Sequence, residues 1–190
     1  MPKKFKPVVN ETTVYVQGRL SYAHLLEPHA AVGSDEKFYS CVILIDKSDT
    51  DSIEAIKKAT DAAVKKGIGT KWQGKEPRKL SLPLHDGEEK EGEEFHGKVY
   101  LNAKSKSAPA VLDRKKAPIL KPDEVYSGMW AIVCLNLYPY SSTGNNGVGA
   151  GLNAILKTAD DEAFSGAANG ARAFDNIEIS DEDDDDEDII

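Results

Sequence analysis

Aromatic rings recur beside lysine and arginine in this sequence at spacings that suit a β-strand. Tyr15 precedes Arg19 by four residues, and Tyr100 lies two residues after Lys98 and four before Lys104. Residues an even number of positions apart point to the same side of a strand, so each stretch presents a ring and a positive charge together. Aromatic faces stack on unpaired nucleobases, each stack contributing about 1 to 3 kcal/mol, while lysine and arginine pair with phosphates. The pattern therefore predicts the binding of single-stranded nucleic acid.

Further candidates come from an apolar stretch late in the sequence and from a long polar segment. In "SGMWAIVCLNLYPY" the aromatic side chains share one face of the expected strand, and in "KWQGKEPRK" a tryptophan and several basic residues would form a lid. A single ring is more often part of a core, but recurrence at the outward positions of three strands favours a shared surface. The predicted DNA-binding residues are Tyr15, Arg19, Trp72, Arg78, Lys98, Tyr100, Lys104, Trp130, Tyr138 and Tyr140.

Patterns for catalysis or metal binding are much weaker. His24 and His29 are five residues apart with Pro28 between them, which is not the spacing of a helical zinc site. His85 and His96 lie in or beside an acidic segment, where solvated histidines are more common than general bases. The sequence contains no GxSxG, GxxxxGK[ST] or HExxH, and a hairpin turn explains the glycine-rich "GNNGVGAG". We expect no catalytic residue, metal or cofactor, and the protein is not expected to be an enzyme.

Charge is divided unevenly along the chain. All 24 Lys and Arg residues lie within residues 1–174, whereas ten of the 32 acidic residues lie within residues 175–190. Residues 181–188 are an unbroken acidic run, which repels itself and buries too little apolar surface to fold alone. We expect one domain over residues 1–174 and a disordered acidic tail over residues 175–190. The basic remainder of the domain is typical of a protein that binds a polyanion.

The elements that position these residues follow from hydrophobic periodicity. Alternating or apolar runs predict strands near residues 12–22, 37–46, 95–104 and 128–138, with Pro139 ending the last of these. An Asn/Gly turn leads to a further strand near residues 148–156, which completes a hairpin. An amphipathic pattern predicts one helix over residues 51–66, ended by Gly67, and a long excursion follows with at most a short strand at residues 80–84.

These elements together predict a mainly β fold with one inserted helix and long loops. An OB-fold-like β-barrel is the leading architecture, and a twisted antiparallel sheet is the alternative. The N-terminal "MPKKFKPVV" lacks the apolar core of a signal peptide, and no apolar run approaches a membrane span, so we expect a cytoplasmic protein. Cys41 and Cys134 lie in apolar stretches, where a free thiol is commonly buried. Because they lack CxxC spacing, they indicate neither a zinc knuckle nor a disulfide framework.

Six stretches occur in an order that points to a known family: "GRLSYAHLLEP", "LIDKSD", "LPLHDGEE", "LNAKS", "YSGMWA" and "NNGVGAGLNAILKT". In these the chain resembles the bacteriophage and prophage single-stranded DNA-binding proteins first catalogued as a domain of unknown function, DUF2815. The resemblance covers roughly residues 18–157. It implies an OB-fold that coats single-stranded DNA without sequence preference during phage replication or recombination, with no catalytic residue and no obligatory metal. A phage origin would place the protein in the cytoplasm of a bacterial host.

The same resemblance gives the acidic tail a role. In such proteins the tail is thought to cover the DNA groove when DNA is absent and to recruit replication or recombination proteins once displaced. The residues concerned are Asp181, Glu182, Asp183, Asp184, Asp185, Asp186, Glu187, Asp188, Ile189 and Ile190. Tails of several related groups end in an aromatic residue, whereas this sequence ends in two isoleucines, which leaves the kind of partner open.

Two other interpretations stay open. An adaptor or chaperone would bind basic proteins through its acidic tail and use the β-domain as a scaffold; deleting the tail would then abolish binding. A metal-dependent hydrolase would use His85, Asp86 or His96 and would lose activity on chelation, although nothing in the sequence favours it. A homo-oligomer is compatible with all of these interpretations.

Overall fold

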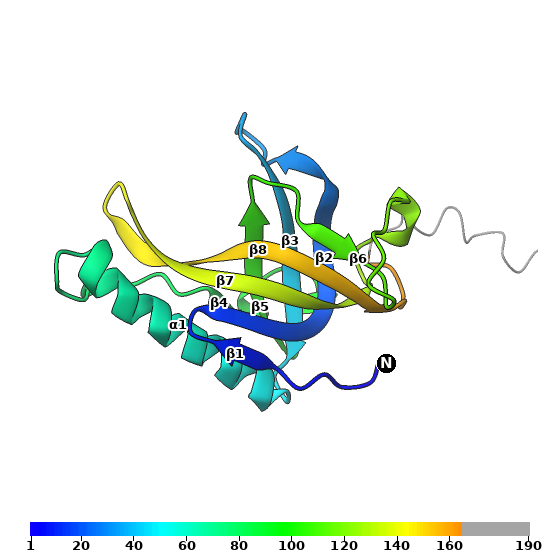
Figure 1. The fold of residues 1–190 in the computed structure, drawn as a ribbon, viewed down its shortest axis with the longest axis horizontal. Coiled ribbons are helices and arrows are strands. Elements are labelled where there is room, and N and C mark those ends of the chain that lie inside the picture. Colours follow the sequence, from blue (N-terminus) through cyan, green and yellow to red (C-terminus); the bar gives the residue numbers. More distant parts are fainter. Residues whose placement is uncertain (165–190) are drawn as a thin grey trace, which may run out of the picture.

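The computed structural model describes residues 1–164, which form one β-barrel with a helix packed against it (Figure 1). Three short 3-10 turns, η1, η2 and η3, interrupt the loops. The strands and the helix are β1 (Val8–Asn10), β2 (Thr13–Ala30), β3 (Lys37–Asp46), α1 (Thr50–Thr70), β4 (Leu84–Asp86), β5 (Lys98–Ser105), β6 (Ala110–Leu112), β7 (Trp130–Ser142) and β8 (Asn145–Ala159). The turns are η1 (Gly87–Glu89), η2 (Glu93–Phe95) and η3 (Pro122–Glu124).

Five strands close the barrel in the order β5-β3-β2-β7-β8. Neighbours along this path are antiparallel, and a short parallel pairing of β5 with β8, from Ala103 to Ala150, joins the two ends. The outer strands β4, β6 and β1 add to β5, β8 and β2 respectively. The predicted mainly β, OB-fold-like barrel with one inserted helix is confirmed.

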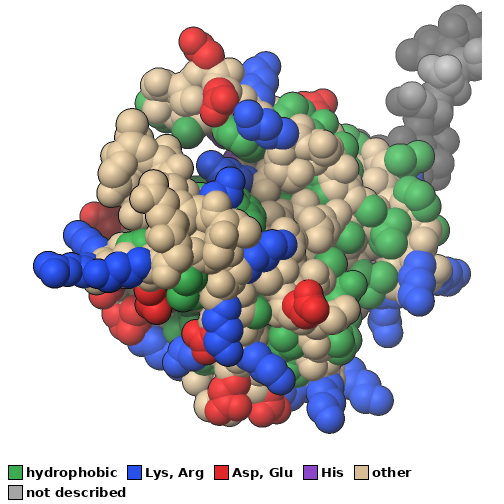
Figure 2. All heavy atoms as spheres, turned by 60° about the vertical axis from the view of Figure 1, so that its left-hand side comes forward, with side chains coloured by type: hydrophobic (Ala, Val, Ile, Leu, Met, Phe, Trp, Pro, Cys, Tyr) green, Lys and Arg blue, Asp and Glu red, His purple; other side chains and the backbone are tan. Residues whose placement is uncertain are grey.

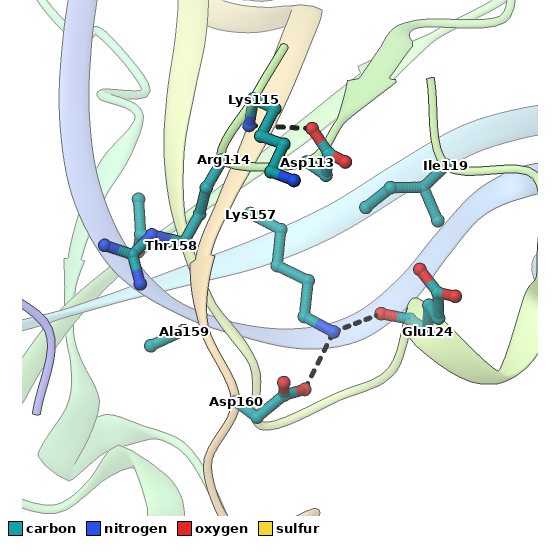
Figure 3. A pocket seen from close by; sticks show the side chains of 9 residues that line it. All are labelled: Asp113, Arg114, Lys115, Ile119, Glu124, Lys157, Thr158, Ala159 and Asp160. Atoms are coloured by element: carbon teal, nitrogen blue, oxygen red, sulfur yellow. Dashed lines mark hydrogen bonds and ion pairs between the residues drawn. The ribbon is translucent and has the colours of Figure 1, made fainter. Parts of the chain in front are cut away.

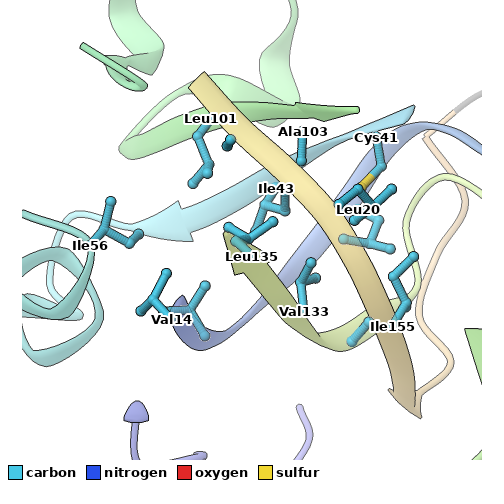
Figure 4. Close-up of a cluster of buried hydrophobic side chains, with 14 of the residues drawn as sticks. Val14, Leu20, Cys41, Ile43, Ile56, Leu101, Ala103, Val133, Leu135 and Ile155 are labelled. Carbon is cyan, nitrogen blue, oxygen red and sulfur yellow. The ribbon is translucent and has the colours of Figure 1, made fainter. Parts of the chain in front are cut away.

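The barrel interior is built from the alternating residues that the sequence pattern assigned to it. Val14, Val16 and Leu20 of β2 are fully buried, as are all the inward residues of β7 from Ala131 to Leu135. They meet Ile43 and Leu101 in one continuous core (Figure 4). Gly18 belongs to the same face of β2, where a Cβ would lie only 2.5 Å from the carbonyl oxygen of Leu44, so a glycine lets β2 and β3 approach.

Helix α1 packs on the barrel mainly against β7 and β2 and is longer than its sequence pattern predicted. The helix does not end at Gly67 but continues to Thr70. A Cβ on Gly67 would lie 2.6 Å from the ring of Trp72 and 2.7 Å from Pro139. Close packing of the helix on the β7–β8 hairpin therefore explains this glycine, which has no part in ending the helix.

The β7–β8 hairpin extends well beyond the barrel, at the left of Figure 1. The prediction that Pro139 ends β7 is wrong, because the strand continues to Ser142 and Pro139 pairs with Val148. The pairing of β7 with β2 stops at Asn136, so beyond that point β7 has only one neighbour. A proline is tolerated on such an edge because no second strand needs its missing N–H.

The long segment between α1 and β5 contains only one short strand, β4, and the two 3-10 turns η1 and η2. The short strand expected at residues 80–84 lies slightly later, at Leu84–Asp86, and Ser81 forms an isolated bridge to Gly147.

Strand β2 runs to Ala30, eight residues past the predicted end. No helix within residues 1–164 is long and apolar enough to cross a membrane.

Candidate nucleic-acid interface

One row of side chains crosses five neighbouring strands on the outside of the barrel. Strand pairing places Trp130 of β7 opposite Arg19 of β2, Arg19 opposite Leu44 of β3, Leu44 opposite Tyr100 of β5, and Tyr100 opposite His85 of β4. Directly opposed residues share a face of the sheet, and the residues adjacent to them in sequence point into the core. We call these five residues the outer row. Three of them belong to the predicted DNA-binding set.

The two predicted lysines of β5 lie on either side of the outer row. Lys98 donates to Asp46 Oδ1 at 2.7 Å, an ion pair that occupies its ammonium. Lys104 lies over the ring of Phe38, 4.6 Å from the ring centroid, and Lys106 is 5.7 Å from the same centroid. Phe38 was missed by the sequence analysis, although it has the same alternation as Leu44 along β3.

Tyr100 is held in place by other rings. The ring of His85 stacks on it with centroids 5.2 Å apart, and Phe95 meets it edge-on at 5.3 Å. The strand predicted near residues 95–104 begins only at Lys98, so the prediction that Phe95 belongs to it is wrong. Phe95 belongs to η2 and is fully buried in a second, smaller cluster with Val42 and Leu44, against which Tyr100 also packs.

The chain that follows β8 crosses the other end of the outer row. We call residues 161–164 the C-terminal strap. Trp130 donates from Nε1 to Asp161 Oδ2 at 2.7 Å, and this hydrogen bond, followed by one from the Glu162 N–H, lowers the pKa of Asp161. Arg19 donates to the carbonyl oxygen of Glu162 at 2.6 Å. The ring of Phe164 lies 4.2 Å from the Arg19 guanidinium and packs against the Leu44 cluster.

Arg19 and Trp130 are thus engaged by the protein's own chain. Arg19 also donates from Nε to the carbonyl oxygen of Gly128 at 2.9 Å and lies 3.7 Å from Asp161 Oδ2. Phe164 places an aromatic ring between an arginine and an apolar floor, which is the environment that a stacked base requires. A ligand on this part of the outer row has to displace the strap.

The remaining predicted tyrosines lie on the same side of their strands but farther away. Tyr15 is 38% exposed and pairs with Cys134 of β7, and a hydrogen bond with that thiol raises the pKa of the phenol. Tyr138 and Tyr140 pair with Gly149 and Gly147 on the extended hairpin, past the last residue that pairs with β2. Tyr138 and Tyr140 extend the aromatic surface along β7, and none of the three tyrosines is part of the outer row.

The structure separates Trp72 and Arg78 from these residues. Trp72 is only 7% exposed and donates from Nε1 to the carbonyl oxygen of Tyr140 at 3.2 Å, so its ring supports the hairpin and presents no free face. Arg78 is exposed and lines a groove of about 710 Å³ between α1 and the following loop, together with Lys57 and Lys65. Residues 57–83 contain eight Lys or Arg and two acidic residues, so this side attracts polyanions.

Basic side chains are distributed widely over the face of the molecule seen in Figure 2. Seen from the side of the β7–β8 hairpin (Figure 2), lysine and arginine form several groups with hydrophobic surface between them, and acidic side chains form smaller groups. This distribution suits a flexible polyanion better than a compact charged ligand.

A separate polar pocket of about 460 Å³ lies where β8 ends (Figure 3). Lys157 points into it, with its ammonium 2.7 Å from both the carbonyl oxygen of Glu124 and Asp160 Oδ1. Because Asp160 neutralises the ammonium, Lys157 itself offers little attraction to an anion. Arg114 and Lys115 line the same pocket beside Asp113.

Histidine and carboxylate side chains are scattered. His24 and His29 stack face to face, with centroids 4.2 Å apart and ring planes 10° apart, a geometry unlike two ligands converging on one ion. Within residues 1–164, no group of three or more His, Cys, Asp or Glu side chains is arranged to hold a metal ion. The predicted tail residues, from Asp181 to Ile190, lie outside the described residues.

Comparison with known proteins gives consistent matches. The family described as "Enterobacter phage Enc34, ssDNA-binding protein" matches residues 11–190. Protein p50 of Acyrthosiphon pisum secondary endosymbiont phage 1 is 34% identical over 175 residues, which is 86% of this chain and 92% of the relative.

Two solved structures show how far the similarity of the fold extends. The single-stranded DNA-binding protein of bacteriophage Enc34, in complex with single-stranded DNA, aligns with a TM-score of 0.71 and 25% identity, covering 87% of this chain and 98% of that one. The single-stranded DNA-binding protein gp2.5 of bacteriophage T7 aligns with a TM-score of 0.50 and 18% identity, covering 78% and 93%. The T7 protein shares the fold.

Proposed function

The chain belongs to the phage family that the Enc34 single-stranded DNA-binding protein represents, and on this premise we propose that it binds single-stranded DNA across the outer row. The observation that carries the proposal is the strand register, which aligns Trp130, Arg19, Leu44, Tyr100 and His85 over five strands. Bases stack on the rings and on the Arg19 guanidinium, while Lys104 and Lys106 track the phosphates.

Binding of this kind does not depend on base sequence. Every base has a π-face, so stacking tolerates all four bases, whereas discrimination requires hydrogen bonds to base edges. The outer row offers rings and the Arg19 guanidinium, whereas Leu44 is buried beneath its neighbours. We propose that the protein coats single strands without sequence preference during phage DNA replication or recombination, and that it does so without catalysing a reaction.

The acidic tail, residues 175–190, is proposed to compete with DNA for this surface and to recruit replication or recombination proteins when DNA displaces it. The position of the C-terminal strap supports the first role, because the chain crosses Arg19 and Trp130 before it reaches the acidic run. A tethered polyanion has an effective concentration on the order of millimolar near its tether, sufficient to oppose phosphate binding at low salt.

Fluorescence anisotropy with labelled oligo-dT, competed by unlabelled single strand or by the matching duplex, tests the proposal. We expect salt-sensitive binding that prefers the single strand and changes little when oligo-dC replaces oligo-dT. Equal affinity for duplex and single strand, or no binding at low salt, would contradict it. Retention on a basic protein that is lost with the tail would support the adaptor interpretation instead.

A further inference from the structure

A bulge in β2 brings an unexpected tyrosine to the outer surface. Ser21 pairs with Val42, but the next registered pair is His24 with Ser40, so β2 has one residue more than β3 between these pairs. Before the bulge Leu20 points into the core, and after it Leu25 does. Even-numbered residues of β2 therefore point into the core before the bulge and odd-numbered residues do so after it. Tyr22, an even-numbered residue at the bulge, lies on the outer side.

Tyr22 adopts a backbone conformation that suits glycine better than a bulky residue. Its φ is +47°, and a bulge residue in this left-handed region is usually glycine. Its side chain is 54% exposed, so burial of the ring does not compensate for the strain. Strained positions of this kind persist where function requires a particular side chain.

The ring of Tyr22 faces the ammonium of Lys90. Lys90 Nζ lies 5.5 Å from the centroid of Tyr22 and 5.0 Å from the centroids of both Phe95 and Tyr100. One lysine thus links Tyr22 to the ring cluster of the outer row. A cation at this distance from an aromatic face is attracted to it.

Lys90 is the single basic residue within residues 86–94, a segment that contains six acidic residues. Within residues 1–164 its ammonium has no carboxylate oxygen within 4.0 Å, so its charge stays available to an anion. The segment itself is anchored at both sides: Lys47 lies 2.7 Å from Asp86, and the Gly97 N–H donates to Glu88 at 2.8 Å. The six acidic side chains give the segment a negative potential, so Lys90 is the one side chain of residues 86–94 that attracts a phosphate.

We propose that Tyr22 and Lys90 form an additional nucleotide subsite beside Tyr100, where an unpaired base stacks on Tyr22 and Lys90 binds the adjacent phosphate. The inference rests on the proposed function and adds to it, because the bulge extends the path of the strand from the outer row toward the β2–β3 hairpin. The strain at Tyr22 is retained because glycine, which the backbone favours, has no ring.

Anisotropy with oligo-dT tests the stacking role through Tyr22→Asn, Tyr22→Phe and Tyr22→Trp. Asparagine tolerates the left-handed conformation but has no ring, so Tyr22→Asn is expected to weaken binding at least about fivefold while the melting temperature is unchanged or higher. The Phe and Trp variants keep a ring and are expected to bind as the wild type does. Gln73→Asn, at another exposed position of positive φ, is the control: its melting temperature is likewise expected to be unchanged or higher, but its affinity for oligo-dT is expected to stay that of the wild type.

Lys90→Ala tests the phosphate contact independently of the strained backbone. It is expected to weaken binding and to lower the slope of log affinity against log salt by about one, whereas Lys90→Arg keeps the slope. Wild-type binding by both Tyr22→Asn and Lys90→Ala, in a protein that still loses affinity on Tyr100→Ala, would overturn the inference and leave the proposed function intact. Failure of the wild type to prefer single strands would overturn both.

Discussion

At the scale of single residues, the proposed interface contains a ring that other rings hold in place. Tyr100 is stacked on His85 and meets Phe95 edge-on, so its ring loses little conformational freedom when a base stacks on it. We expect Tyr100→Ala to weaken oligo-dT binding about 5- to 100-fold, from the magnitude of a base–aromatic stack, and Tyr100→Phe to retain wild-type affinity. Anisotropy titration measures both. An equal loss in the two variants would show that the hydroxyl, and not the ring, matters.

The C-terminal strap gives a second prediction at this scale. Asp161→Asn removes the carboxylate that accepts from Trp130 and lies beside Arg19, so the strap is expected to release more easily and DNA to bind several-fold tighter. Glu162→Gln removes the same charge, but Glu162 contacts Arg19 through its main-chain carbonyl. The matched variant separates the strap contact from a general loss of negative charge. Equal tightening in both would assign the effect to charge alone.

At the scale of elements, replacing either of two glycines of α1 by alanine is expected to change stability in opposite directions. Gly67 lies against Trp72 and Pro139, where a Cβ would approach to 2.6 Å, whereas a Cβ on Gly69 would meet nothing within 4 Å. Gly67→Ala is expected to destabilise the protein by about 1 to 3 kcal/mol through overpacking. Gly69→Ala is expected to stabilise it by about 0.5 to 1 kcal/mol, because alanine is the better helix former. Urea unfolding of the two variants measures the difference, and shifts of the same sign would refute this assignment.

His24, in the part of β2 that extends past the predicted end, makes the free energy of unfolding depend on pH. Burial, followed by the proximity of His29, lowers the pKa of His24 below 6.5, so the folded state binds fewer protons here than the unfolded chain. This contribution to stability is fully present above about pH 6.5 and is lost as the pH falls through the lowered pKa of His24. Urea midpoints at pH 7.5 and 5.5 should differ less in His24→Asn than in the wild type. An unchanged difference would assign the effect to other groups.

At the scale of the whole molecule, charge is divided unevenly along the chain. Residues 1–174 carry all the Lys and Arg residues and a slight basic excess, while residues 175–190 carry ten acidic residues and no basic one. We expect deletion of residues 181–190 to tighten single-stranded DNA binding, most strongly at low salt, because a tethered competitor is removed and salt screens its effect. Titration of both chains at two salt concentrations measures this. Unchanged affinity at low salt would eliminate the competition.

The fold class and the outward positions of several candidate site residues were determined by the sequence alone, for a local reason. Alternation along a strand fixes which residues share a face, so the inner faces of β2 and β7 and the outward positions of Arg19, Tyr100 and Trp130 were predictable without knowing any neighbour. The motifs spread over residues 18–157 likewise identified the family that the comparisons established.

Tertiary structure decided the rest, because it depends on contacts between residues far apart in the chain. Strand register aligned the outer row and left Tyr138 and Tyr140 on a distant hairpin. Packing against α1 and the hairpin buried Trp72, which composition alone assigned to a lid. One extra residue in β2 reversed its phase and exposed Tyr22, a change that a period of two cannot predict, since a bulge is defined only against the partner strand.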